Sequence, residues 1–157
     1  MPGIKYFPQD LNIENKRIIL RLDLNVPILE KKIQDFTRIS LVLPFLEQLI
    51  KKKSKIVLLT HLGRPKGVKD LSLSLLPVYK YLKEKLSTNM YFYTGEINDE
   101  LKTKCSYLKN GEIILIENIR FFKDEEKNEE NFSKKISELG DLYINDAFSC
   151  SHRKQAS

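Results

Sequence analysis

The chain alternates short apolar runs with stretches of helical period. Five runs of five to seven residues are rich in Ile, Leu, Val and Tyr, which is typical of strands buried on both faces. They cover residues 17–23, 55–60, 90–94, 112–116 and 141–145. From this pattern we expect five strands.

The segments between these runs carry apolar residues at helical spacing. From Ile39 to Ile50 the apolar positions recur every three or four residues, although Pro44 should remove one hydrogen bond and bend the helix. Similar stripes predict helices over residues 75–86, 98–108 and 132–139, and Gly140 suits the end of the last one. We expect the charged run over residues 123–130 to be a solvated loop.

Strands that alternate with helices predict an α/β fold. The expected architecture is a doubly wound, parallel sheet with helices on both faces, which is a Rossmann-like three-layer arrangement. The 157 residues suit one domain and would be cramped as two. We therefore expect a single domain over residues 1–157.

Composition narrows the class of protein further. With 41% hydrophobic and 31% charged residues, the sequence has a soluble globular profile, and it has no apolar run near the length of a membrane span. Its first ten residues do not resemble a secretory signal, so we expect a cytoplasmic protein with no membrane partner. Cys105 and Cys150 lie far apart, which disfavours a disulfide framework and a closed zinc site.

The net charge of +6 and the pI near 9.2 suggest an anionic partner. Nucleic acid is the first candidate, but most of the 27 basic residues are lysines scattered along the chain. The sequence also lacks a helix-turn-helix signal and a surface motif of aromatic and basic residues. We therefore expect no nucleic-acid partner, and the arginines become the better indicator because a guanidinium grips phosphate or carboxylate in a fixed geometry.

The scarce polar residues gather where the expected strands end. In open parallel sheets, ligands bind outside the carboxyl ends of the strands. The residues near these ends, or at the start of the first helix, are Arg21, Asp23, Asn25, Arg38, His61, Arg64, Arg120, His152 and Arg153. Five of the six arginines and both histidines thus fall at one edge of the sheet, which predicts a positive cleft for a small polyanion.

Structural roles are the alternatives for several of these residues. Arg21 could pair with a neighbouring carboxylate inside the protein, and Asp23 and Asn25 could be turn residues before Pro27. Cys150 and His152 could form half of a metal site, but the sequence offers no second ligand pair to complete it.

The sequence shows no machinery for binding a nucleotide. With only six glycines, it has neither a lysine-bearing phosphate loop nor a dinucleotide fingerprint, and it has no nucleophile elbow. It also lacks an acidic cluster that would suit magnesium. The residues by themselves therefore indicate an anion-binding α/β domain.

Five ordered motifs resemble those of the phosphoglycerate kinase family. They are RLDLNVP (residues 21–27), DFTRI (35–39), THLGRPKG (60–67), ENIRF (117–121), and NDAF (145–148) followed by His152 and Arg153. The resemblance runs nearly from end to end of the chain. Five motifs in the same order are more specific than any one of them.

The resemblance implies a transferase of glycolysis that moves a phosphoryl group reversibly between 1,3-bisphosphoglycerate and ADP, giving 3-phosphoglycerate and ATP, with Mg²⁺. Carried over by position, the residues implied to bind the phosphoglycerate are Asp23, Asn25, Arg38, His61, Arg64, Arg120 and Arg153. Arg38 would also contact the phosphoryl group in transfer, which makes it the implied catalytic residue. Mg²⁺ and the nucleotide would not bind to this chain alone.

The family's chains are more than twice as long as this one, and the glycine-rich nucleotide loop and the magnesium ligand lie in their C-terminal part. We therefore expect this chain to be the phosphoglycerate-binding N-terminal domain, and to be inactive by itself. It ends in HRKQAS where the family more often reads HRAHAS, and residues 149–151 replace a common Gly-Thr-Ala segment. A stand-alone anion-binding or regulatory module without catalysis is the alternative.

Overall fold

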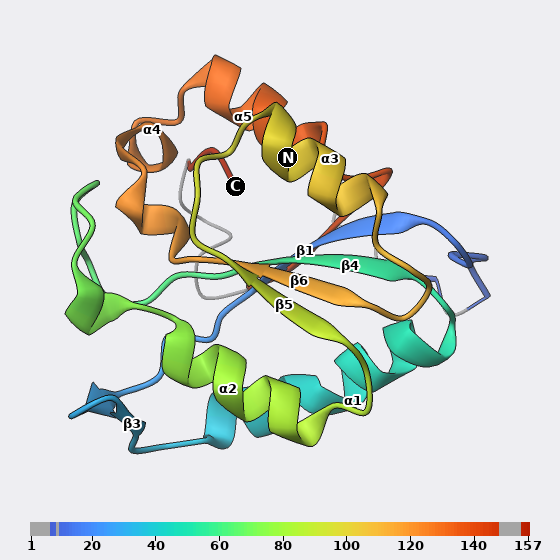
Figure 1. Ribbon diagram of the computed structural model, residues 1–157, viewed down its shortest axis with the longest axis horizontal. Coiled ribbons are helices and arrows are strands. Elements are labelled where there is room, and N and C mark those ends of the chain that lie inside the picture. The colour runs from blue at the N-terminus through green and yellow to red at the C-terminus, as the bar shows by residue number, and fades with distance from the viewer. Residues whose placement is uncertain (1–6, 9, 148–154) are drawn as a thin grey trace.

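The computed structural model describes residues 7–8, 10–147 and 155–157, and shows a five-stranded sheet between layers of helices (Figure 1). The strand order is β5-β6-β4-β1-β7, and every neighbouring pair in this sheet is parallel. The bounds are Arg17–Leu22 for β1, Lys55–Leu59 for β4, Met90–Tyr93 for β5, Ile113–Ile116 for β6 and Leu142–Asp146 for β7. The five expected strands are confirmed.

Helices cover both faces of the sheet, as expected. Figure 1 shows α1 (Thr37–Lys51) and α2 (Leu76–Lys85) below the sheet, and α3 (Asp99–Ser106) and α5 (Glu130–Ser137) above it. The chain steps from β1 to β4 and on to β5 in one direction, and then returns through β6 to β7. Because parallel crossovers are right-handed, this reversal places the later helices on the opposite face. The doubly wound α/β fold is confirmed.

The apolar core lies in two parts, one on each face of the sheet. Alternate residues of the strands point to opposite sides, so Ile18, Ile56 and Ile113 join the core below. Ile19, Val57 and Ile114 join the core above, which α3 and α5 cover. Residues buried on both faces explain why the strands read as continuous apolar runs.

Residues 123–130 do not form the solvated loop that the sequence suggested. Lys123–Glu126 form a one-turn helix, α4, and the side chain of Glu125 is fully buried. The burial follows from contacts with Ser157, whose backbone N–H donates to a carboxylate oxygen of Glu125 at 2.9 Å. One carboxylate of a charged segment can thus be buried when a segment distant in the sequence supplies its hydrogen-bond donors.

The structure also contains short elements that the sequence pattern did not predict. These are the hairpin of β2 (Ile28–Leu29) and β3 (Lys32–Ile33), and the 3₁₀ turns η1 (Leu71–Leu73) and η2 (Ile119–Phe121). Each is two or three residues long, which is too short to show a hydrophobic period.

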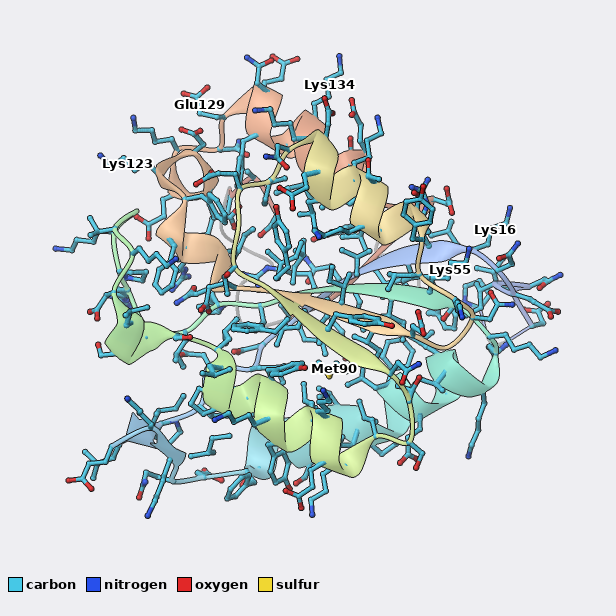
Figure 2. The ribbon with its side chains drawn as sticks, viewed as in Figure 1. Lys16, Lys55, Met90, Lys123, Glu129 and Lys134 are labelled. Carbon is cyan, nitrogen blue, oxygen red and sulfur yellow. The ribbon has the colours of Figure 1, made fainter. Side chains whose placement is uncertain are left out.

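Most of the described lysines are exposed, and they lie on all sides of the fold. Figure 2 shows Lys16 and Lys55 beside the amino ends of β1 and β4, and Lys123 and Lys134 on the outer surface of α4 and α5. The lysine charge is therefore spread over the surface. In the described part of the chain, no helix is long and apolar enough to cross a membrane.

Candidate functional site

The carboxyl edge of the sheet brings together most of the residues that the sequence singled out. Asp23 and Asn25 follow β1, His61 and Arg64 follow β4, and Arg120 lies in η2, just after β6. Arg38 lies in the first turn of α1. Arg153, together with Cys150 and His152, falls outside the described residues.

Arg38 pairs with Asp23 across the start of α1. The guanidinium Nη1 donates to Oδ2 of Asp23, and half of the Arg38 side chain is exposed against 13% of the Asp23 side chain. Just before Arg38, the hydroxyl and the backbone N–H of Thr37 donate to Asp35 and hold the pKa of that carboxyl below its ordinary value. The local turn therefore places Arg38 beside the strand end while leaving its side chain open to solvent.

Asp23 and Asn25 shape the loop after β1. Oδ1 of Asp23 accepts from the backbone N–H of Asn25 at 3.1 Å, which is the turn role that the sequence left open. The side-chain oxygen of Asn25 then accepts from the N–H of Gly63 at 2.9 Å. The hydroxyl of Thr60 accepts from the N–H of Leu24 at 3.0 Å, so the loops after β1 and β4 are joined twice.

Asn118 is a structural centre of the site that the sequence reasoning did not single out. Its fully buried amide accepts from the backbone N–H groups of Leu62 and Arg120, both at 3.2 Å. It also donates to the carbonyl oxygens of Leu62 at 2.7 Å and Leu73 at 3.0 Å. One side chain thus connects three loops, and an Asn two residues after the end of an apolar run is the signal that could have indicated it.

Glu117 joins the same edge to the start of α2. Its carboxylate accepts from the hydroxyl of Ser74 at 2.6 Å and from the backbone N–H groups of Leu75 and Asn118, both at 2.8 Å. Only 5% of the residue is exposed. A buried carboxylate is stable here because N–H and O–H donors surround it at a helix amino end.

Two buried arginines lie behind the exposed ones. Arg21 and Arg120 are each 2% exposed, whereas Arg64 is exposed to solvent. Nη1 of Arg120 donates to the carbonyl oxygen of Gly63 at 2.8 Å, and Nη2 of Arg21 contacts Nδ1 of His61 at 3.2 Å. Arg21 therefore has partners inside the protein, and one of them is a histidine of the site, whereas the structural alternative expected a neighbouring carboxylate.

Glu125 balances this buried positive charge. Burial raises the pKa of the Glu125 carboxyl, while the Ser157 hydroxyl and the charges of Arg21 and Arg120 act in the opposite direction. At the same edge, the guanidinium groups of Arg38 and Arg64 are exposed to solvent. The site therefore has the charge to attract a small anion.

The loop after β4 packs closely against α4 at Gly67. This glycine has a φ of +72°, and a Cβ added to it would lie 2.8 Å from the Cα of Lys123. Its N–H also donates to the carbonyl of Arg120 at 3.1 Å. Gly67 therefore allows the loop that carries Arg64 to lie against the segment that carries Arg120.

Gly67→Ala should lower the free energy of unfolding by about 2–4 kcal/mol, because backbone strain adds to a steric clash. Gly111→Ala is the matched control, since Gly111 also has a positive φ of +84° but its nearest neighbour would be 3.5 Å away. We expect about 1 kcal/mol for the control. Chemical denaturation of both variants measures the difference, and equal losses would contradict the packing argument.

The residues at this edge suit binding and charge neutralisation of an anion. No group of three or more His, Cys, Asp or Glu side chains within the described ranges could hold a metal ion. A hollow of about 520 Å³ lies elsewhere, between α5, β7 and residues 155–157, and none of the predicted ligand residues that the structure describes lines it. The candidate site is thus a surface of donors at the strand ends.

Comparisons with known proteins agree on one family. Residues 8–157 match the phosphoglycerate kinase family. The phosphoglycerate kinase of Borrelia hermsii is 45% identical over 149 residues, which are 95% of this chain and 38% of that protein. That of Brucella suis is 43% identical over 148 residues, covering 94% of this chain and 38% of the relative.

Solved structures give the same result. The phosphoglycerate kinase of Coxiella burnetii superimposes with a TM-score of 0.83 at 37% identity, covering 95% of this chain and 36% of that one. The enzyme of Pyrococcus horikoshii superimposes with a TM-score of 0.82 at 33% identity, over 94% and 38% of the two chains. This chain therefore spans well under half the length of these relatives, and it belongs to the phosphoglycerate kinase family.

Proposed function

We propose that residues 1–157 are the phosphoglycerate-binding N-terminal domain of a phosphoglycerate kinase. The complete enzyme would transfer a phosphoryl group reversibly between 1,3-bisphosphoglycerate and ADP, giving 3-phosphoglycerate and ATP, as a cytoplasmic step of glycolysis. The observation that carries the proposal is the set of arginines and His61 at one edge of the sheet, in a chain whose relatives bear that name.

The proposed ligands divide by exposure. Arg38 and Arg64 have exposed side chains and would reach a phosphate or carboxylate group directly. His61 and Arg120 are buried beneath them and would contact the anion from within. Asp23 and Asn25 would accept from the substrate hydroxyl, and Arg153 would complete the set.

Nucleotide and Mg²⁺ would bind to the C-terminal part that the longer relatives carry. When bound there, Mg²⁺ would neutralise charge on the transferring phosphates. The residues of this chain would orient the acceptor carboxylate, and Arg38 would meet the charge on the phosphoryl group. Because phosphoryl transfer depends on positioning and electrostatics, no covalent nucleophile is needed.

Calorimetry tests the substrate. The chain should bind 3-phosphoglycerate saturably and should show no specific binding of ADP or ATP. Arg64→Ala should weaken the binding of 3-phosphoglycerate about tenfold or more, because a charge-assisted hydrogen bond is lost. Arg17→Ala is the control. It removes a guanidinium group at the amino end of β1, away from the candidate site, where Arg17 pairs with Asp141, and it should leave the affinity for 3-phosphoglycerate unchanged.

Thermal stability separates this substrate from other anions. A hundredfold excess of 3-phosphoglycerate over its dissociation constant should stabilise the fold by about 2.7 kcal/mol. Sulfate at matched ionic strength should stabilise it less, since sulfate offers no carboxylate or hydroxyl group. Equal shifts in the melting temperature would indicate a general anion-binding module and would reject the substrate.

The isolated chain should have no kinase turnover, because the donor and the acceptor must be aligned by both halves of the enzyme. A coupled assay with ADP and 1,3-bisphosphoglycerate measures this. Turnover that persists through purification to homogeneity would contradict the division of the sites between two domains.

A further inference from the structure

A buried chain of hydrogen bonds leads from α4 to the ring of His61. The hydroxyl of Ser157 and its backbone N–H both donate to the Glu125 carboxylate. The same hydroxyl oxygen accepts from Nε of Arg21 at 3.0 Å. Arg21 then reaches Nδ1 of His61 through Nη2 at 3.2 Å, so that four side chains from distant segments are joined in series.

The chemistry of the guanidinium group fixes the direction of the hydrogen bond between Arg21 and His61. A guanidinium has five N–H donors and no acceptor, so Arg21 can only donate to His61. Nδ1 of His61 must therefore be unprotonated, and the ring proton must be on Nε2. A ring protonated on both nitrogens would place two N–H groups against each other at this contact.

Each nitrogen of the Arg21 guanidinium group has a hydrogen-bond partner. Its Nη1 donates to the carbonyl of Leu22 at 3.1 Å, while Nε is bound to the Ser157 hydroxyl and Nη2 to His61. Arg21 is 2% exposed and Glu125 is fully buried. Because a buried charge needs a partner, Glu125 and Ser157 keep the guanidinium in this orientation.

We propose that Glu125, Ser157 and Arg21 form a positioning relay that holds His61 neutral with its proton on Nε2. The ring then acts as an N–H donor for an anion at the strand ends. The identification of that anion as phosphoglycerate rests on the proposed function, whereas the tautomer of His61 is independent of it. Glu125 and Ser157 act only through Arg21, and Arg21 acts through His61.

Nitrogen NMR of the histidine rings tests the tautomer directly. The chain has two histidines, so its ring spectrum contains two spin systems, and His152→Gln assigns them. In the ligand-free chain near pH 7, Nδ1 of His61 should have the shift of an unprotonated ring nitrogen, and Nε2 that of a protonated one. A proton on Nδ1, or on both nitrogens, would overturn the proposal.

Variants test the relay. Arg21→Met should remove the preference for the Nε2 proton, and Ser157→Ala should weaken it because Arg21 loses one of its anchors. Arg17→Met is the matched control, since Arg17 lies on the same strand but pairs with Asp141, and it should leave the His61 signals in place. His61 signals that are unchanged in both Arg21→Met and Ser157→Ala would refute the relay.

Ser157→Ala keeps the test decisive if Arg21→Met fails to fold, because Ser157 is only half-buried and loses a single hydroxyl. Both variants should also bind 3-phosphoglycerate more weakly, by about tenfold for Arg21→Met. If the tautomer is as expected and depends on Arg21, but 3-phosphoglycerate does not bind, the relay is supported and the proposed substrate is rejected.

Discussion

Arg38→Ala in a full-length phosphoglycerate kinase carrying these residues should lower kcat by about 10²–10³, while KM for 3-phosphoglycerate changes only severalfold. This is the size of effect seen when one donor to a developing charge is removed from an active site. An interaction made mainly in the transition state lowers the rate rather than the affinity. Steady-state kinetics of the variant and the unsubstituted enzyme measure both quantities.

The structure supports this role through the placement of Arg38. The residue is the second of α1, and its pairing with Asp23 directs the guanidinium toward the end of β1. Its side chain is half exposed, unlike those of Arg21 and Arg120, so it can move onto a charge that appears only during transfer. Arg38→Lys should restore little activity, because lysine lacks the planar fork of donors.

Arg17→Ala and Arg120→Ala provide the comparisons for Arg38→Ala. Arg17→Ala should leave kcat near that of the unsubstituted enzyme, since Arg17 binds Asp141 at the amino end of the sheet. Arg120→Ala should mainly weaken substrate binding. If Arg38→Ala raises KM and leaves kcat unchanged, Arg38 binds the substrate and does not contact the phosphoryl group in transfer.

The sequence predicted the main sheet because its strands are buried on both faces. Runs such as Ile113–Ile116 are apolar at every position. This pattern can be recognised from the sequence alone, because it does not depend on any distant contact. The same logic placed Asp23, Asn25, His61, Arg64 and Arg120 at one edge, since parallel strands share a carboxyl end. Local pattern and topology were sufficient for these residues.

The remaining features depend on contacts between distant segments. In the sequence, Glu125 is one of several acids in a charged run. Its burial depends on the hydrogen bond from Ser157, which lies 32 residues later. The role of Asn118 depends on its hydrogen bonds to Leu62 and Leu73, which lie far from it in the sequence. Polar residues of this kind carry no periodic signal, because their partners are set by the folded structure.

Asn118→Ala should cause a larger loss of stability than Gly67→Ala. The change removes four hydrogen bonds, to the backbone groups of Leu62, Leu73 and Arg120. A buried backbone group left without a partner costs about 1–3 kcal/mol, and relaxation will recover part of the total. We expect the free energy of unfolding to fall by about 3–5 kcal/mol, measured by chemical denaturation.

Asn89→Ala is the matched control, because the Asn89 amide has one side-chain bond, to Glu112 at 2.9 Å, just before β5. It should cost about 1 kcal/mol and leave ligand binding intact. Asn118→Ala should also weaken the binding of 3-phosphoglycerate at temperatures where the variant is still folded, because Asn118 ties the loop of His61 and Arg64 to the turn of Arg120. A variant that loses stability but binds 3-phosphoglycerate as tightly as the unsubstituted chain would show that Asn118 supports the fold without positioning the site.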